Sequence, residues 1–136
     1  MIVGIGTDII EIARIKKAMT NERFLSKIFT ESEIAYCQQK AQPEASFAAR
    51  FAAKEAVAKA FGQGIGQIGW RDIIVVNHDN GQPSIALKHE ALRLKEQLGI
   101  KTLWITLTHS RDYAVATAIL EGNDHEVGNK PTNESH

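Results

Sequence analysis

Two acidic residues and one lysine have the types and spacing of a metal-dependent phosphate site. Glu55 and Lys59 lie four residues apart in an alanine-rich run without helix breakers, so both project from one side of a predicted helix. Asp8 follows Gly4 and Gly6 on one side of a predicted strand, where glycines leave room for another segment to approach. If the fold brings Asp8 and Glu55 together, they suit Mg²⁺, which takes one or two carboxylates plus substrate phosphates. Lys59 could then meet the same phosphates.

Each of these residues also has a simpler interpretation. Glu55 and Lys59 have the spacing of an ordinary surface ion pair, with the glutamate first. Asp8 could be a strand-end cap or a turn residue. His109 and Ser110, where a strand enters a turn, could donate to an anion, but a histidine in a hairpin is more often a surface or packing residue.

The glycine-rich segment 62–69 is typical of a flexible loop and is also a candidate for contacting a ligand. It matches neither the dinucleotide nor the Walker fingerprint.

The elements that must position these residues follow hydrophobic periodicity. Strands are predicted over 2–10, 70–77, 84–87, 102–109 and 113–120, and helices over 11–19, 21–28, 30–40, from Ser46 or earlier to Phe61, and 88–98. Asn21 and the Thr30–Glu33 capping box begin two of the helices. Hairpins over 73–87 and 103–120 leave little room for a doubly wound parallel sheet. We therefore predict an α+β fold, a single compact domain of helices packed on a small, mostly antiparallel sheet.

Composition supports one domain and excludes some partners. The chain has 136 residues, 43% of them hydrophobic, which is enough for one core. A formal net charge of zero provides no global attraction for nucleic acid or an anionic membrane. A lone cysteine, no signal-peptide pattern and no apolar run of about 20 residues make the cytoplasm the expected location. We expect the domain over residues 1–120 and a polar, disordered tail over 121–136.

Four blocks of the chain together resemble one family. They are Gly4 to Glu11 with Arg14-Ile15, Arg50 to Ala56 with Lys59 to Gly62, Gly64-Ile65-Gly66, and Leu107 to Ser110 with Tyr113-Ala114. In order and spacing they resemble the holo-[acyl-carrier-protein] synthases, the short bacterial type of 4′-phosphopantetheinyl transferase. The resemblance covers residues 1 to about 120 and does not reach the tail.

The resemblance implies a reaction. The family transfers 4′-phosphopantetheine from coenzyme A to a serine of apo acyl carrier protein, releases adenosine 3′,5′-bisphosphate, and so supports fatty acid biosynthesis. Carried over by position, Asp8, Glu55 and Lys59 are catalytic. Asp8 and Glu55 hold Mg²⁺, Glu55 or a water beside it acts as base, and Lys59 steadies the phosphates. The implied coenzyme A contacts are Arg50, Lys59, Gly62, Gly64, Gly66, Gly81, Pro83, His109 and Ser110.

The resemblance also implies partners. Family members of this length assemble as homotrimers with sites between subunits, so Asp8, Glu55 and Lys59 are expected from one subunit and His109-Ser110 from its neighbour. Arg14 matches a position that contacts the acidic recognition helix of the carrier protein, with Lys17, Arg23 and Phe24 as neighbours. Such local charges can steer an acidic carrier without a basic protein overall.

Two other classes of function remain open at the level of sequence. One is a non-catalytic module that binds coenzyme A or a carrier protein, in which Asp8, Glu55 and Lys59 are ordinary ion pairs. The other is a different Mg²⁺-dependent phosphotransferase or pyrophosphatase, which would not label a serine of the carrier.

Overall fold

The structure is a computed structural model that describes residues 1–62 and 67–123. Two candidate ligand residues, Gly64 and Gly66, and the tail from residue 124 lie outside the described residues. The elements are β1 (Ile2–Glu11), α1 (Ile12–Ala18), α2 (Glu22–Ile28), α3 (Glu31–Gln38), α4 (Pro43–Ala60), the 3₁₀ turn η1 (Trp70–Asp72), β2 (Ile73–Asn77), β3 (Pro83–Leu87), α5 (His89–Gln97), β4 (Ile100–His109) and β5 (Tyr113–Gly122).

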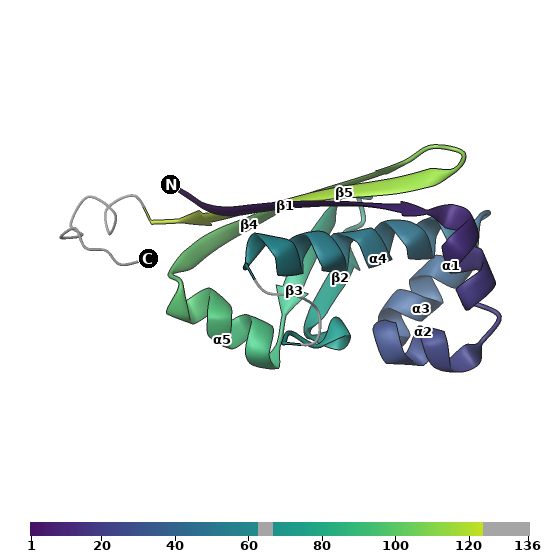
Figure 1. Cartoon of the computed structure of the whole chain (residues 1–136), viewed down its shortest axis with the longest axis horizontal. Helices are drawn as coiled ribbons and strands as arrows, with labels where there is room; N and C mark the ends of the chain where they lie inside the picture. Colours follow the sequence, from purple (N-terminus) through teal and green to yellow (C-terminus); the bar gives the residue numbers. More distant parts are fainter. Residues whose placement is uncertain (63–66, 124–136) are drawn as a thin grey trace.

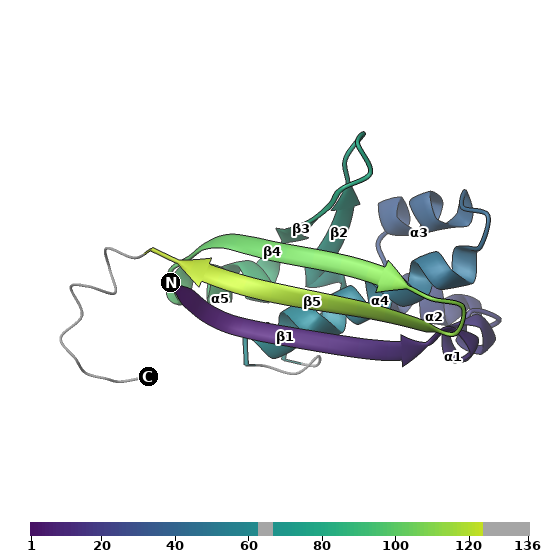
Figure 2. The same cartoon turned by 90° about the horizontal axis from the view of Figure 1, so that it is seen from above.

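Three long strands form an antiparallel sheet in the order β1-β5-β4, which Figure 2 shows from above. The helix α4 runs under one face of this sheet, with α1, α2 and α3 at one end and α5 at the other (Figure 1). The strands β2 and β3 form a separate antiparallel hairpin. The predicted α+β class with mostly antiparallel strands is confirmed. Within the described residues, no helix has the length and apolar character needed to cross a membrane.

Two glycines allow α4 to lie directly against β1. A Cβ atom at Gly4 would lie 2.0 Å from the carbonyl oxygen of Ala60, and one at Gly6 would lie 2.2 Å from that of Ala56. Neither position can hold a side chain without separating the two backbones. The close approach expected from the glycines of this strand therefore exists, and it brings Asp8 beside the last turns of α4.

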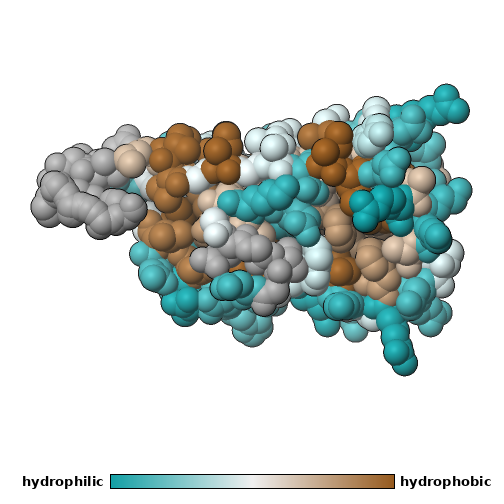
Figure 3. Space-filling model, viewed as in Figure 1, coloured by the Kyte–Doolittle hydropathy of each residue, from teal (hydrophilic) through white to brown (hydrophobic). Residues whose placement is uncertain are grey.

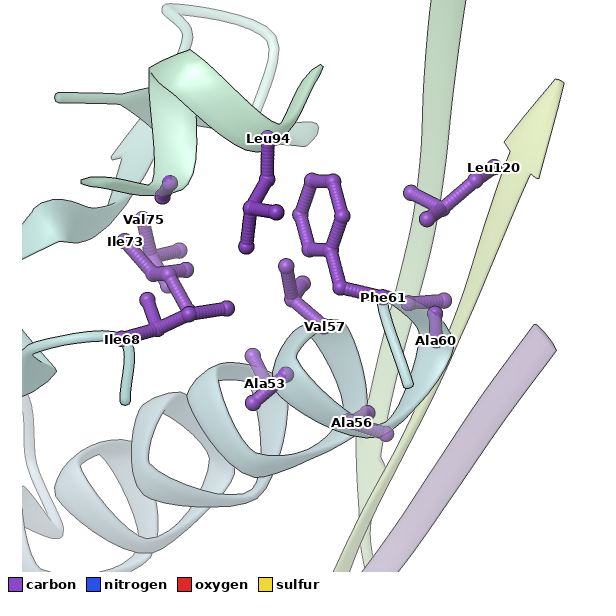
Figure 4. Close-up of a cluster of buried hydrophobic side chains, with 14 of the residues drawn as sticks. Ala53, Ala56, Val57, Ala60, Phe61, Ile68, Ile73, Val75, Leu94 and Leu120 are labelled. Carbon is purple, nitrogen blue, oxygen red and sulfur yellow. The ribbon is translucent and has the colours of Figure 1, made fainter. Parts of the chain in front are cut away.

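The main core cluster fills the space between α4, the β2–β3 hairpin and α5, and it extends to residues of β4 and β5. Val57 and Phe61 face Ile68, Ile73 and Leu94 in this cluster, as Figure 4 shows. A second cluster fills the helical end of the molecule, where the rings of Phe29 and Phe47 lie 5.1 Å apart. Both clusters pack on α4, so this helix is buried around most of its circumference.

Local start and stop signals were predicted well. Asn21 accepts from the N–H of Arg23, and Thr30 and Glu33 form the complete capping box. Gly99 has a φ of 68° after α5, as the residue closing a helix often does.

Two of the differences from the predicted boundaries have a clear structural cause. The strand predicted from Trp70 begins at Ile73, because Trp70–Asp72 form a 3₁₀ turn in which the Trp70 carbonyl accepts from Lys54. The last strand continues to Gly122, because Glu121 still pairs with Ile2 of β1.

The face of the sheet away from α4 carries large exposed apolar side chains. Ile5 is 65% exposed, Ile9 61% and Trp104 57%. Figure 3 shows brown, apolar side chains gathered along the edge of the molecule where the sheet lies. We call this surface, defined by Ile5, Ile9 and Trp104, the outer sheet face.

Candidate active site

Asp8, Glu55 and Lys59 meet where β1 crosses α4. The ammonium of Lys59 donates to Asp8 Oδ1 at 3.0 Å and to the carbonyl oxygen of Thr7 at 3.2 Å. The side chain of Asp8 is 15% exposed and that of Lys59 is 52% exposed. Lys59 is thus paired across the fold with Asp8, and the ordinary pair within the helix is replaced by a tertiary contact.

Glu55 completes this cluster of charges. Burial raises the pKa of the Glu55 carboxyl, and the nearby charge of Asp8 raises this pKa further, while Lys59 acts in the opposite direction. Two carboxylates that repel each other in a partly buried place are a site where a cation is favourable. Asp8 and Glu55 therefore have the electrostatic relationship expected of residues sharing one ion.

The donor set fits a hard cation with few protein ligands. Among the described residues, no group of three or more histidines, cysteines and acidic residues is arranged to hold a metal. A protein that offers two carboxylates leaves other positions for water and substrate phosphates, as Mg²⁺ requires. The residues present are thus compatible with Mg²⁺ and unlike a closed structural zinc site.

A second cluster surrounds a hollow between α3, α4, the β2–β3 turn and the end of β4. This hollow has a volume of about 200 Å³. Its lining includes Tyr36, Arg50, Asn77, Gly81, Pro83 and His109. A neighbouring hollow of about 350 Å³ shares Tyr36, Arg50 and His109 and adds Lys40. We refer to the two together as the basic hollow, because Lys40, Arg50 and His109 line it.

Arg50 is held firmly at the wall of the basic hollow. It is only 8% exposed, donates to Asn77 Oδ1 at 2.8 Å and to the Ser46 carbonyl at 3.3 Å. Its guanidinium carbon lies 4.7 Å from the centre of the Tyr36 ring. A guanidinium oriented by several partners is suited to recognising a phosphate.

The turn after β4 places the other predicted anion-binding residues. His109 is exposed at the end of β4, and its Nδ1 lies 3.3 Å from the Ser110 carbonyl oxygen. The Ser110 hydroxyl accepts from the N–H of Tyr113 at 3.3 Å, which closes the β4–β5 turn. Gly62 follows α4 with a φ of 78°, and no atom of the described residues lies within 4 Å of the place where a Cβ would be.

The residues predicted to bind a partner lie on the first two helices. Arg14, Lys17 and Arg23 are exposed. Phe24 is half-buried, and its ring lies 6.4 Å from that of Phe51 on α4. The helices α1 and α2 therefore present three cationic side chains and the half-buried ring of Phe24.

The structure thus gathers most of the predicted catalytic and coenzyme A residues into two groups. It brings Lys59 into contact with Asp8 and places Glu55 near enough that, besides burial, the charge of Asp8 raises its pKa. It also brings Arg50, Gly81, Pro83 and His109 together around one hollow, whose lining does not include Gly62 or Ser110. The lining of the basic hollow contains none of the first group. Tyr36, Lys40 and Asn77 were not singled out from the sequence. The sequence shows only that Tyr36 and Lys40 are four residues apart, about one helical turn. This spacing is too common to indicate a binding site by itself.

Comparison with known proteins identifies the class. A family model described as the 4′-phosphopantetheinyl transferase superfamily matches residues 4–118, and the chain belongs to this superfamily.

Individual relatives resemble the chain over most of their length. A holo-[acyl-carrier-protein] synthase from Chlamydia felis is 52% identical over 118 residues, covering 85% of this chain and 93% of the relative. The crystal structure of such a synthase from Neisseria meningitidis has a TM-score of 0.81 at 34% identity, covering 89% of this chain and 99% of that one. Another, from Bacillus anthracis in complex with CoA (3′,5′-ADP), has a TM-score of 0.75 at 36% identity, covering 90% of this chain and 99% of that one.

Proposed function

We propose that the protein transfers 4′-phosphopantetheine from coenzyme A to a serine hydroxyl of apo acyl carrier protein. The observation that carries this proposal is the meeting of Asp8, Glu55 and Lys59 in a member of this superfamily. The relatives named holo-[acyl-carrier-protein] synthases support the choice of substrates, one of them through its complex with CoA (3′,5′-ADP).

In this proposal the chain supplies charge, orientation and a base. Mg²⁺ held by Asp8 and Glu55 would neutralise the diphosphate of coenzyme A. Glu55, or a water beside it, accepts the proton of the serine hydroxyl, and the serine oxygen bonds to the phosphorus nearer the pantetheine. The bond from that phosphorus to the bridging oxygen breaks, and adenosine 3′,5′-bisphosphate leaves. Lys59 stabilises the charge that develops on the departing phosphate.

The basic hollow is the proposed site of the nucleotide end of coenzyme A. Arg50 and His109, with Ser110, would hold its phosphates, since Lys40, Arg50 and His109 line this hollow. Gly81 and Pro83 would border the nucleotide, as would the segment that contains Gly62, Gly64 and Gly66.

We propose a homotrimer in which each site lies between two subunits. The outer sheet face, with Ile5 and Trp104 more than half exposed, supports an assembly that covers it. The lining of the basic hollow, which includes none of Asp8, Glu55 and Lys59 of the same chain, also supports this. In the assembly, one subunit contributes Asp8, Glu55 and Lys59, and its neighbour contributes His109-Ser110 with the adjoining Arg50.

Carrier protein is proposed to dock on the first two helices. Arg14, Lys17 and Arg23 would face its acidic helix, and Phe24 would pack against its apolar edge. These three cations are exposed, so they are accessible to a charged partner.

The proposed reaction is tested directly by measuring the mass of the carrier protein. The protein is incubated with Mg²⁺, coenzyme A and apo acyl carrier protein, and the carrier is measured by mass spectrometry. We expect the carrier to gain one phosphopantetheine group at a serine. A carrier of unchanged mass would contradict the proposal. Nucleotide binding alone would then indicate a binding module, and phosphate release without labelling would indicate another phosphotransferase or a pyrophosphatase.

Subunit mixing tests the shared site. Glu55→Ala and His109→Ala chains are each expected to be inactive alone. When they are unfolded and refolded together, some sites receive an intact Glu55 from one chain and an intact His109 from another, and activity returns. Absence of activity in verified mixed oligomers would contradict the shared site.

A further inference from the structure

A fully buried ion pair joins α3 to α4 and has no part in the proposed reaction. The side chains of Glu33 on α3 and Lys54 on α4 are both 0% exposed, and Lys54 Nζ lies 2.9 Å from Glu33 Oε1. Lys54 directly precedes Glu55 in the sequence but points into the core. Burial lowers the pKa of Lys54, and the charge of Glu33 opposes this effect.

Every hydrogen-bonding direction of this lysine is used. Besides Glu33, Lys54 Nζ donates to the carbonyl oxygens of Trp70, at 3.0 Å, and Ile73, at 2.6 Å. An ammonium has three donors, and all of them have acceptors here. The network therefore has a directional geometry that apolar packing would not impose.

Glu33 contacts the same strand through its second oxygen. Its Oε2 accepts from the N–H of Val75 at 2.7 Å, while Oε1 also accepts from the N–H of Thr30 at 2.9 Å. Backbone groups of alternate residues point toward β3: the Asp72 carbonyl accepts from the Lys88 N–H, and the His78 N–H donates to the Gln82 carbonyl. The backbone groups of Ile73 and Val75, which alternate with these residues, point away from β3. The ion pair therefore binds the edge of β2 that faces away from β3. Lys54 donates to this edge and Glu33 accepts from it, as the backbone groups of a neighbouring strand would do.

The three elements joined in this way are three walls of the basic hollow. The helix α3 contributes Tyr36, one turn after Glu33. The helix α4 contributes Arg50, one turn before Lys54. The strand β2 contributes Asn77, two residues after Val75, and Asn77 accepts the hydrogen bond of Arg50.

We propose that Glu33 and Lys54 are positioning residues for the basic hollow. Their ion pair locks α3, α4 and β2 in one arrangement and so fixes Tyr36, Arg50 and Asn77 around the nucleotide. A buried ion pair adds little stability over apolar residues of similar volume, so geometry is the reason to have one here. The meeting of Asp8 with α4 depends instead on Gly4 and Gly6, so it is independent of the pair.

This inference rests on the proposed use of the hollow for the nucleotide of coenzyme A, so its test begins with binding alone. Adenosine 3′,5′-bisphosphate is titrated calorimetrically into the unaltered protein, into Glu33→Gln, and into Glu33→Leu/Lys54→Met. We expect both variants to bind about tenfold more weakly, the size typical of coupling through a contacting network. The KM for coenzyme A should rise by a similar factor, while the KM for carrier protein and the Mg²⁺-induced thermal shift stay within about twofold.

Val57→Ala is the matched control. Val57 is fully buried on the same helix but belongs to the apolar cluster under α5, so its truncation lowers stability without touching the ion pair. We expect its nucleotide affinity to stay within about twofold of the unaltered protein. Equal weakening in Val57→Ala and Glu33→Gln would overturn the positioning role, as would unchanged affinity in both ion-pair variants.

Hydrogen exchange tests the contact between Glu33 and β2 in the unaltered protein, without any variant. The Val75 amide is expected to exchange as slowly as the ladder amides of β2 and β3, because Glu33 protects it. Rapid exchange would overturn the proposal even if the variants do not fold.

If the unaltered protein bound no adenosine 3′,5′-bisphosphate, the proposed function would fail first. Binding that the ion-pair changes leave intact would remove only the positioning role.

Discussion

Lys59 on α4 donates to Asp8 on β1, although Glu55 lies one helical turn away on its own helix. Among the described residues no ion pair joins Glu55 to Lys59. The lysine is therefore turned toward the first strand, and Glu55 keeps a carboxyl whose pKa is raised by burial and by Asp8. An arrangement with two repelling carboxylates and one lysine that pairs with Asp8 makes distinct predictions for metal, pH and packing.

Mg²⁺ is expected to stabilise the protein through these two carboxylates. A ligand present at about 100 times its Kd stabilises the folded state by about 2.7 kcal/mol, which appears as a higher Tm. Asp8→Asn and Glu55→Gln should lose most of this shift. Glu96→Gln, an exposed carboxylate on α5, should keep it. Differential scanning calorimetry with and without Mg²⁺ measures the effect, and equal shifts in all the proteins would contradict the site.

The stability of the metal-free protein should depend on pH through Glu55. Because the folded-state pKa is raised, the proton at Glu55 stabilises the fold fully below the ordinary glutamate value of 4.5, and this stability is lost as pH rises through the raised pKa. Glu55→Gln lacks the titration. Its Tm should therefore match that of the unaltered protein at low pH and exceed it above the raised pKa. A difference that is constant across pH would contradict this assignment. Protons should also compete with Mg²⁺ as the pH falls.

Gly6→Ala should separate β1 from α4. The new Cβ would lie 2.2 Å from the Ala56 carbonyl oxygen, so the backbones must move apart, at a loss of about 1–3 kcal/mol in urea unfolding. Because Asp8 moves with β1, the Mg²⁺-induced thermal shift should fall as well. Gly62→Ala is the control, since its positive φ makes alanine unfavourable while no atom of the described residues lies within 4 Å of the added Cβ. It should lose stability and keep the Mg²⁺ shift; retention of the shift in Gly6→Ala would count against the shared cation.

Ile5→Asp should dissociate the proposed trimer. A carboxylate on the outer sheet face would be buried without a partner in an apolar interface, which is strongly unfavourable. Light scattering should report the trimer mass for the unaltered protein and a lower mass for the variant. Leu92→Asp, which changes an exposed leucine on α5, should leave the mass unchanged. A monomeric unaltered protein would contradict the assembly.

Arg14→Glu should weaken carrier docking. At low salt we expect the KM for apo acyl carrier protein to rise about tenfold, because a like charge replaces an attractive one. The difference should shrink as salt increases, since exposed charges are screened. Steady-state kinetics at several salt concentrations measures it. Lys88→Glu reverses an exposed charge next to α5 and should leave this KM nearly unchanged; an unaltered KM in Arg14→Glu would exclude the docking surface.

Local features of the fold were readable from the sequence because they depend on neighbouring residues. Periodicity located α4, capping residues located the starts of α2 and α3, and the glycines of β1 indicated a close approach. The boundary at Trp70 was wrong, since the 3₁₀ turn depends on a hydrogen bond from Lys54, sixteen residues earlier.

The relationships between distant residues could not be predicted in the same way. Glu33 was correctly predicted as a capping residue, but its second role with Lys54 and Val75 exists only once three elements pack together. Likewise, spacing alone suggested that Lys59 pairs with Glu55, while the fold pairs it with Asp8. Tertiary contacts redirect side chains whose local partners are equally available.

The pairing of β1 with β5 determines when the acidic cluster can form. Asp8 lies opposite Ala116, and the strand that carries it has β5 as its neighbour in the sheet. During synthesis from the N-terminus, β1 leaves the ribosome long before β5 exists, so it must wait unpaired while α4 and the core residues emerge. Pairings between such distant segments form late and slowly. We therefore expect Asp8 to reach its place beside Glu55 and Lys59 only after β5 has been made, since a nascent chain that lacks β5 carries Asp8 on a strand without its sheet neighbour.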